Sequence, residues 1–253
     1  MGKTLPAGPN GTVNPRLRSG IRLGTSMRGV LADAYHARGH GRSGLWLTYS
    51  PKADKDVVLK SDIEFGHFLL VESDPDVVNV DYAPARRLQT YAGEGIATIV
   101  DAELTLSNGT VVWREVKCSE DVENGATGRA NLQLLIQIKA AEAVAARHEL
   151  ITEKEIYANP MRIRNWMRIV PWLAQAREWP LHAYVSEVAA LMRTRGNVVL
   201  ADVLNLGDSR DSAIYAAALF RAVQRGRYGN DLAERPLTSR SVFRLQGGRD
   251  EET

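Results

Sequence analysis

The chain has 253 residues, 44% of them hydrophobic, and a formal net charge of +2 at pH 7, so it can hold one large domain or two small ones with ample core. Its single cysteine, Cys118, excludes an internal disulfide and a zinc site built from cysteines, and it favours a reducing cytoplasmic setting. The sequence shows neither a signal peptide nor an apolar run of membrane-spanning length, so no membrane contact is expected.

Charge is distributed unevenly along the chain. Residues 1–60 hold 10 Lys and Arg against 3 Asp and Glu, and residues 158–249 hold 14 against 7. Residues 61–157, in contrast, hold 8 basic and 17 acidic side chains. Basic flanks around an acidic centre suit a protein that contacts a phosphate backbone at its edges and holds cations in the middle. Ordinary solvated surfaces would give the same counts.

Residues 1–41 are predicted to form a flexible basic arm, because residues 1–20 are rich in Gly, Pro, Asn and Arg and show little apolar periodicity. Such an arm can order on DNA or on a partner. His36 and His40 have the spacing of two metal ligands on a helix. No further ligand of that kind lies nearby in the sequence, so we interpret them as ordinary surface or core histidines.

Residues 42–160 are predicted to form an α/β domain. After its last strand, Thr152 and Glu155 have the spacing of a capping box, which predicts the start of another helix. The other expected elements are a helix over 61–73, strands over 77–82 and 86–91, a hairpin over 96–118, a helix over 130–148 and a strand over 149–151.

Prolines interrupt the following stretch, so residues 161–180 are predicted to form a helical connector. Residues 181–246 then show three short helical segments followed by two strand-like ones, an order that resembles a winged helix-turn-helix domain. The helices are expected over 184–193, 198–206 and 212–225, the strands near 227–228 and 242–244, and an acidic tail over 247–253.

The predicted hairpin carries an acid on its first strand and an acid-x-lysine on its second, namely Asp101, Glu115 and Lys117. Hard divalent cations prefer carboxylate oxygens, and a neighbouring lysine can hold a phosphate or a developing alkoxide. The three residues therefore predict a metal-dependent phosphodiesterase site, provided that they share one face of the hairpin.

The loop of the hairpin decides whether they share a face. A two-residue loop of Asn108 and Gly109 would place Asp101 opposite Val116 and send Glu115 to the other face. A three-residue loop over 107–109, with Gly109 in the left-handed conformation, places Asp101 directly opposite Glu115.

The apolar pattern favours the three-residue loop, because it gathers the apolar side chains on one face as a core side. Two opposed carboxylates repel each other, and a divalent cation between them would remove the conflict. The competing interpretation is a solvated polar face on a half-exposed sheet. The residues expected on the core side are Ile96, Val100, Ala102, Leu104 and Leu106, against Val112 and Val116.

Glu64 is the candidate for a further carboxylate ligand. In the functional interpretation it points from its helix toward the hairpin and completes the metal shell with Asp101 and Glu115. In the competing interpretation it belongs to a capping box and accepts a hydrogen bond from the backbone N–H of Ser61. The spacing by itself favours the cap.

The motifs along residues 42–175 are, in order, Ser61-x-x-Glu64, Glu72-x-Asp74-Pro75-x-Val77, Pro84, Asp101, Asn108-Gly109, Glu115-Val116-Lys117 and Glu149-Leu150-Ile151-Thr152-Glu153. This order resembles the TnsA family, the endonuclease subunits of heteromeric transposases, and the winged-helix-like residues occupy the place of that family's C-terminal domain. Restriction enzymes and resolvases share the acid, acid-x-lysine core, whereas the flanking segments are more specific. The proline that often precedes the first motif aspartate is Val100 here, at a position that supplies no ligand.

The resemblance implies a restriction-endonuclease-like core of the PD-(D/E)xK type, with a mixed sheet flanked by helices and a helical winged-helix-like domain after it. Glu64, Asp101 and Glu115 would then coordinate one or two Mg²⁺, for which Mn²⁺ would substitute, with the backbone carbonyl of Val116 as a further ligand. Lys117 would orient the attacking water or stabilise charge at the phosphate.

The resemblance also implies a role in bacterial cut-and-paste transposition. The family's subunit hydrolyses one strand, at the 5′ ends, of the transposon ends, while a DDE-type transposase cuts and joins the other and an AAA+ ATPase acts with them. The expected partners are therefore double-stranded DNA and these two subunits, on the nucleoid. The sequence holds no P-loop of its own, which fits this division of labour.

Two alternatives stand beside this hypothesis. A stand-alone restriction or repair-type nuclease with the same core would cut DNA without a partner. A non-enzymatic winged-helix DNA-binding adaptor would instead use arginines as phosphate contacts, with the carboxylates as surface charge. The candidate contacts, to DNA or to an acidic partner protein, are Arg210, Arg221, Arg225 and Arg227.

Overall fold

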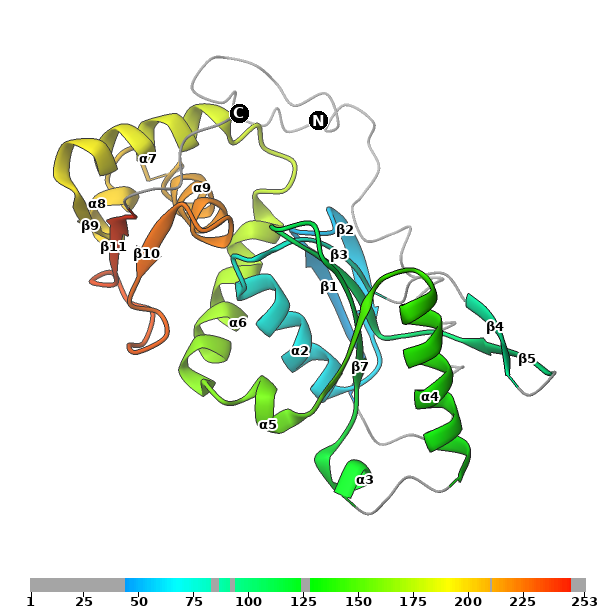
Figure 1. Cartoon of the computed structure of the whole chain (residues 1–253). Helices are drawn as coiled ribbons and strands as arrows, with labels where there is room; N and C mark the ends of the chain where they lie inside the picture. The colour runs from blue at the N-terminus through cyan, green and yellow to red at the C-terminus, as the bar shows by residue number, and fades with distance from the viewer. Residues whose placement is uncertain (1–43, 83–86, 92–93, 124–127, 210, 247–253) are drawn as a thin grey trace, which may run out of the picture. The chain divides into compact units, whose positions relative to one another are not determined.

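The computed structural model describes residues 44–82, 87–91, 94–123, 128–209 and 211–246. The predicted basic arm with its two histidines, Pro84, Arg210 and the acidic tail lie outside these residues. The described residues fall into two compact units, an N-terminal unit that ends at Ile163 and a C-terminal unit that begins at Arg164 (Figure 1). No helix in the described part of the chain is long and apolar enough to cross a membrane.

The N-terminal unit is built on a four-stranded mixed sheet in the order β3-β6-β7-β8. Strand β6 pairs antiparallel with both β3 and β7, whereas β8 runs parallel to β7. Strands β1 and β2 pair with each other as a separate hairpin, and so do β4 and β5. The bounds are β1 (Trp46–Ser50), β2 (Lys55–Leu59), α2 (Asp62–Ser73), β3 (Val77–Tyr82), β4 (Arg87–Tyr91), β5 (Glu94–Thr98), β6 (Ala102–Leu106), β7 (Val111–Val116), α3 (Ser119–Glu123), α4 (Gly128–Ala143), β8 (Arg147–Ile151) and α5 (Glu153–Ile156).

Helices α2 and α4 cover opposite faces of the sheet and lie on either side of β7 in Figure 1. On one face, Phe68 of α2 packs against Tyr82 with their ring centroids 5.5 Å apart, and Tyr82 pairs with Ala102 of β6. On the other face, Ala140 of α4 lies in a buried cluster with Trp113 of β7. Because side chains alternate along β7, a helix on each face buries both sets of its residues.

Most of the predicted elements of this unit are present, but the hairpin is shorter than expected. Residues 94–98 pair with β4, so the β6–β7 hairpin begins only at Ala102. Val100 packs with Trp113 and the α4 helix, not with Ala102 as predicted. The reason is a bend at Asp101, which interrupts the strand alternation on which that prediction depended. The hairpin of β1 and β2 was not predicted.

The predicted helix over 130–148 also needs correction, because α4 ends at Ala143. The chain reverses there: Ala145 adopts a φ of 56°, and Ala146 donates a backbone hydrogen bond to Ala141 at 2.9 Å. Residues 147–148 therefore belong to β8, where His148 lies beside Trp113.

The C-terminal unit contains four helices and a three-stranded antiparallel sheet, ordered β10-β11-β9, among the described residues. Residues 161–180, predicted as a connector, supply most of α6, and the buried Asn165 ties this helix to Leu232 and Leu237 by hydrogen bonds of 2.8 Å. The predicted helix over 198–206 begins with a strand. The bounds are α6 (Pro160–Gln175), α7 (His182–Arg195), β9 (Asn197–Val199), α8 (Leu200–Leu204), α9 (Ser212–Gln224), β10 (Tyr228–Asn230) and β11 (Val242–Leu245).

Candidate active site

A three-residue loop sets the register of the β6–β7 hairpin, as predicted. Leu106 donates a backbone hydrogen bond to Thr110 at 2.9 Å, and Gly109 donates one to Leu106 at the same distance. Gly109 has a φ of 82°, a left-handed conformation that glycine adopts without steric cost. The ladder ends at the pair of Ala102 and Arg114, so Asp101 lies just beyond the start of β6, where its backbone N–H bonds to Arg114, the residue before Glu115.

The bend at Asp101 aims its carboxylate at the neighbouring strand. The backbone N–H of Asp101 donates to the carbonyl of Arg114 at 3.0 Å, and its Oδ2 accepts from the backbone N–H of Val116 at 2.7 Å. A side-chain oxygen thus takes the place of a backbone acceptor at the start of β6. This arrangement fixes the Asp101 carboxylate at the strand end, next to Glu115.

Glu115 is only 4% exposed, and both of its carboxylate oxygens have partners. Its Oε1 lies 2.7 Å from Nζ of Lys117, and its Oε2 accepts a hydrogen bond of 2.8 Å from Nε2 of Gln137 on α4. The predicted acid, acid and lysine therefore come together on one face, and the interpretation as a merely solvated polar face is wrong for Glu115.

The ionisable groups at this site shift one another's pKa values. Burial and the charge of Glu115, with a smaller effect of Glu64, raise the pKa of Asp101 to about 7, although the Val116 N–H bond lowers it. Burial disfavours the Lys117 cation, but the hydrogen bond and charge of Glu115, together with Asp101, outweigh it and raise the pKa of Lys117. Lys117 is therefore a cation near neutral pH, beside two carboxyl groups that repel each other.

Glu64 stands at the start of α2 in a helix cap. Ser61 Oγ accepts from the backbone N–H of Glu64 at 3.1 Å, and the Glu64 carboxylate accepts from the backbone N–H of Lys60 at 2.9 Å. The cap interpretation is thus confirmed, with the acceptor bond one residue earlier than predicted. Its ligand role stays a prediction, supported only by the effect of its charge on Asp101.

The side chains at the hairpin fit a hard divalent cation. They present carboxylate oxygens, the donors that Mg²⁺ prefers, and a cation would offset the repulsion that raises the pKa of Asp101. Across the described ranges, no three or more His, Cys, Asp or Glu side chains are arranged to hold a metal ion. A cation here would thus be held by Asp101 and Glu115, with the predicted Val116 carbonyl.

Gln137 is the site residue that was not predicted from the sequence. It is fully buried on α4, and besides Glu115 its Nε2 reaches the backbone carbonyl of Ile99 at 3.3 Å. Its Oε1 lies 3.4 Å from Nε2 of His148 on β8. The sequence offered one signal for it, because Gln137 directly follows the buried Ile136 on the helix. A polar side chain on the buried face of a helix needs a hydrogen-bond partner.

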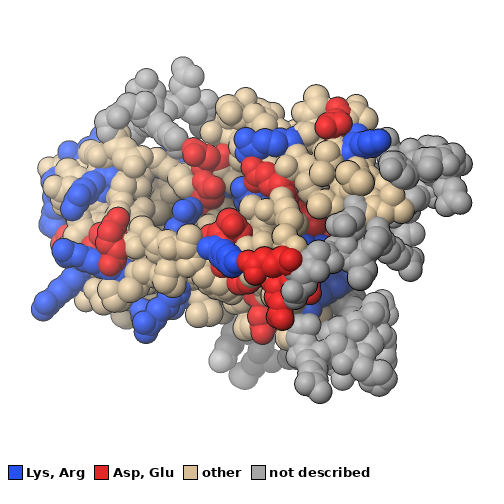
Figure 2. Space-filling view, turned by 60° about the horizontal axis from the view of Figure 1, so that its bottom comes forward, with Lys and Arg blue, Asp and Glu red and all other residues tan. Residues whose placement is uncertain are grey.

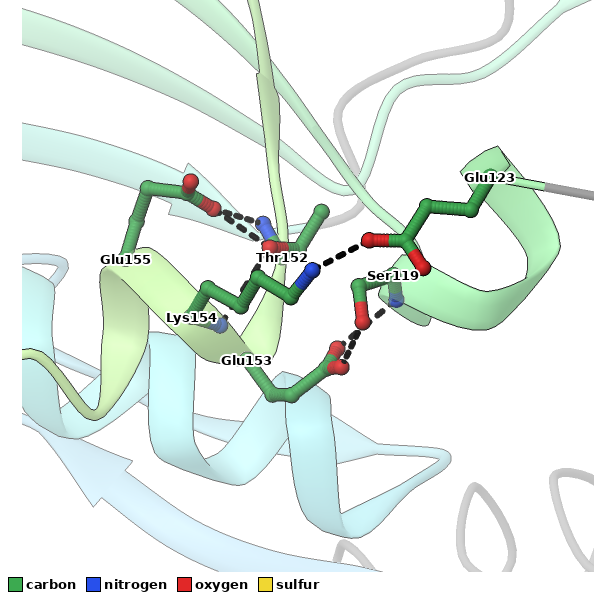
Figure 3. Close-up of polar contacts among 6 residues, drawn as sticks. All are labelled: Ser119, Glu123, Thr152, Glu153, Lys154 and Glu155. Atoms are coloured by element: carbon green, nitrogen blue, oxygen red, sulfur yellow. Dashed lines mark hydrogen bonds and ion pairs between the residues drawn. The ribbon is translucent and has the colours of Figure 1, made fainter.

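Polar contacts anchor the chain directly after Lys117 (Figure 3). Ser119 donates through its backbone N–H, at 2.8 Å, and through its hydroxyl to the carboxylate of Glu153. Lys154 forms an ion pair with Glu123, which brings α3 to α5. We call the six residues of this region the α3–α5 junction; they are Ser119, Glu123, Thr152, Glu153, Lys154 and Glu155. The junction ties α3, which begins two residues after Lys117, to α5.

The predicted arginine contacts lie in the C-terminal unit, except Arg210, which is outside the described residues. Arg225 and Arg227 are exposed and Arg221 is partly exposed. Burial and then the charges of Arg221 and Arg227 lower the pKa of Arg225, so these three like charges are close together. Ten of the 13 residues of α9 are buried, which leaves this helix little surface for reading a DNA groove.

On the face shown in Figure 2, Asp and Glu side chains gather in one part of the surface, while Lys and Arg side chains are more dispersed.

Neither the comparison with protein-family models nor that with curated proteins finds a match for this sequence. The case for a function therefore depends on the residues of the site.

Proposed function

We propose that the protein is a metal-dependent DNA endonuclease whose active site is formed by Asp101, Glu115 and Lys117. The observation that carries this proposal is the meeting of the three side chains on one hairpin, with Lys117 Nζ 2.7 Å from the buried Glu115. Neighbouring carboxylates repel each other unless positive charge offsets them, and a bound cation would add to the charge that Lys117 supplies.

Each residue has a role that its surroundings support. Asp101 and Glu115 would hold the cation, with the Val116 carbonyl as a further ligand and Glu64 as the predicted fourth. A bound divalent cation would supply a Lewis acid that lowers the pKa of a water and neutralises charge at the phosphate. Lys117 is 42% exposed and positively charged, so it suits charge stabilisation at the phosphate better than proton abstraction.

Within this activity we favour the transposase subunit that the sequence motifs suggest. The protein would cut one strand at the transposon ends, while a DDE-type transposase acts on the other strand and an AAA+ ATPase acts with them. The fold would then be restriction-endonuclease-like, and the helix-strand-helix-helix-strand-strand order of residues 182–245 would be a winged helix. These assignments rest on the order of the motifs.

The two alternatives differ in their support. A stand-alone nuclease would use the same site residues and differ only in cutting DNA alone. The adaptor hypothesis is favoured by the cluster of Arg221, Arg225 and Arg227, but the burial of α9 speaks against it. If these arginines contact phosphates, replacing Arg227 should reduce the slope of the logarithm of the DNA-binding constant against the logarithm of the salt concentration by about one.

The test is a cleavage assay on duplex DNA that carries the transposon ends, with Mg²⁺ or Mn²⁺, in the presence and absence of the two partner subunits. The native chain should cut in the presence of its partners, and Lys117→Ala should lose the activity. Lys154→Ala, which alters an exposed lysine of the α3–α5 junction, is the matched control. Cutting by the protein alone would favour the stand-alone nuclease, and no cutting in any mixture would contradict the proposal.

A further inference from the structure

Gln137 connects the two segments that carry the candidate metal ligands. Its Nε2 donates to Glu115 Oε2 at 2.8 Å and to the carbonyl of Ile99, two residues before Asp101, at 3.3 Å. One amide group from α4 therefore bridges the chain that leads into Asp101 and the carboxylate opposite it. The side chain is fully buried, so these bonds do not compete with solvent.

The orientation of this amide follows from the hydrogen-bonding capacities of its neighbours. An ionised carboxylate and a backbone carbonyl only accept, so the NH₂ group of Gln137 must face Glu115 and Ile99. Its Oε1 then faces His148, 3.4 Å away, and accepts a bond only if His148 Nε2 carries a proton.

The surroundings of His148 favour this protonation state. Burial lowers its pKa, while the charges of Glu115 and Glu149 act in the opposite direction. The ring is therefore largely neutral near pH 7, and the neighbouring Oε1 of Gln137 favours the tautomer with its proton on Nε2. In this tautomer the Nε2–H of His148 disfavours a flipped Gln137 amide, because a flip would place the NH₂ group of Gln137 against this N–H.

We propose that Gln137 is a positioning residue for Glu115 and that His148 fixes the orientation of its amide. Lys117 holds Oε1 of Glu115 and Gln137 holds Oε2, so the carboxylate plane is held from both sides. The bond to Ile99 also fixes the distance between this plane and the segment before Asp101. This inference rests on the proposed function, because its consequence is a preorganised cation site.

The first test compares Mn²⁺ binding by calorimetry in the native chain, Gln137→Met and Gln133→Met. Methionine is similar in size to glutamine but cannot donate, and Gln133 is exposed on the same helix. Gln137→Met should weaken Mn²⁺ binding by about 10-fold or more, as the loss of a supporting hydrogen bond behind a metal ligand commonly does. Gln133→Met should bind as the native chain does.

Equal affinity of Gln137→Met and the native chain would overturn the inference while leaving the proposed function intact. A native chain that binds no Mn²⁺ would overturn the proposed function, and the inference with it, so the two failures are distinguishable.

A second measurement needs no substitution and covers the case in which Gln137→Met does not fold. In the metal-free native chain, NMR should show slowly exchanging side-chain amide protons for Gln137 and rapidly exchanging ones for Gln133. Amide protons of Gln137 that exchange as fast as those of Gln133 would overturn the inference, whatever the metal affinity.

Discussion

The carboxylates of the β6–β7 hairpin and those of the α3–α5 junction are surrounded in opposite ways. At the α3–α5 junction, hydrogen bonds from Ser119 lower the pKa of Glu153, and bonds from Thr152 lower that of Glu155. At the hairpin, burial and a neighbouring carboxylate raise the pKa of Asp101 to about 7. These directions mean that the ionised forms of Glu153 and Glu155 favour the folded state, whereas the ionised form of Asp101 disfavours it unless a cation binds.

The largest expected effect comes from removing one charge of the opposed pair. Asp101→Asn should reduce DNA cleavage by at least about 100-fold, because the cation loses a charged ligand and the phosphate loses its stabilisation. The same variant should be no less stable than the native chain in EDTA at pH 7.5, since its amide oxygen can still accept from Val116 and the repulsion is gone. Cleavage rates and chemical denaturation measure the two effects. A clear loss of stability would mean that Asp101 is a structural residue like those of the junction.

The pH dependence of stability is a second test of the difference between the hairpin and the junction carboxylates. Asp101 titrates near 3.8 in the unfolded chain and near 7 in the folded one, so the folded state binds more protons between these values. The contribution of Asp101 to the free energy of unfolding of the metal-free protein should therefore fall as the pH rises from about 4 to about 7, while the buried His67, whose pKa burial lowers to about 3, contributes a change of the opposite sign.

Denaturation in EDTA at several pH values checks this as the difference between the native chain and Asp101→Asn, which lacks this contribution. Saturating Mg²⁺ should reduce it in the native chain, because the cation stabilises the ionised form. A native profile identical to that of Asp101→Asn would contradict the raised pKa.

A smaller effect is expected where a hydrogen bond stabilises the fold. Thr152 caps α5, its hydroxyl accepting from the backbone N–H of Lys154 at 3.2 Å while Glu155 accepts from the backbone N–H of Thr152 at 2.8 Å. Thr152→Ala should lower the free energy of unfolding by about 1 kcal/mol without changing Mn²⁺ affinity. Thr152→Ser keeps the cap and should restore most of the stability. Loss of metal binding in Thr152→Ala would show that the junction and the site are coupled.

The smallest effect is expected at the exposed ion pair of the junction. Lys154 and Glu123 are 60% and 64% exposed in their side chains, so solvent screens their attraction. Lys154→Ala should leave the thermal unfolding midpoint and the cleavage rate unchanged. A shift of several degrees would mean that this pair, unlike most exposed pairs, holds α3 in place.

Features that depend on neighbouring residues were predictable from the sequence. Gly109 and the alternation of the strands determine the hairpin register, and with it the meeting of Asp101 and Glu115. Ser61 and Thr152 mark helix starts by their side chains alone. Such signals act within a few residues, so a single sequence contains them in full.

Features that depend on distant contacts were not predictable in the same way. The pairing of Gln137 with Glu115 spans 22 residues and requires α4 to lie over β7. Val100 changed sides because a bend at Asp101 broke the strand pattern, and no local signal marked that bend. The end of α4 depends on a left-handed Ala145, a residue that does not usually mark a turn.

Calorimetric titration of Mn²⁺ into the native chain and Asp101→Ala, each with a short DNA duplex, tests the central claim most directly. It does not require the two partner subunits that the cleavage assay includes. The proposed site predicts saturable binding by the native chain and its loss in Asp101→Ala, with both proteins folded. Absence of binding to either protein at millimolar Mn²⁺, or equal binding to both, would contradict a metal site at the hairpin.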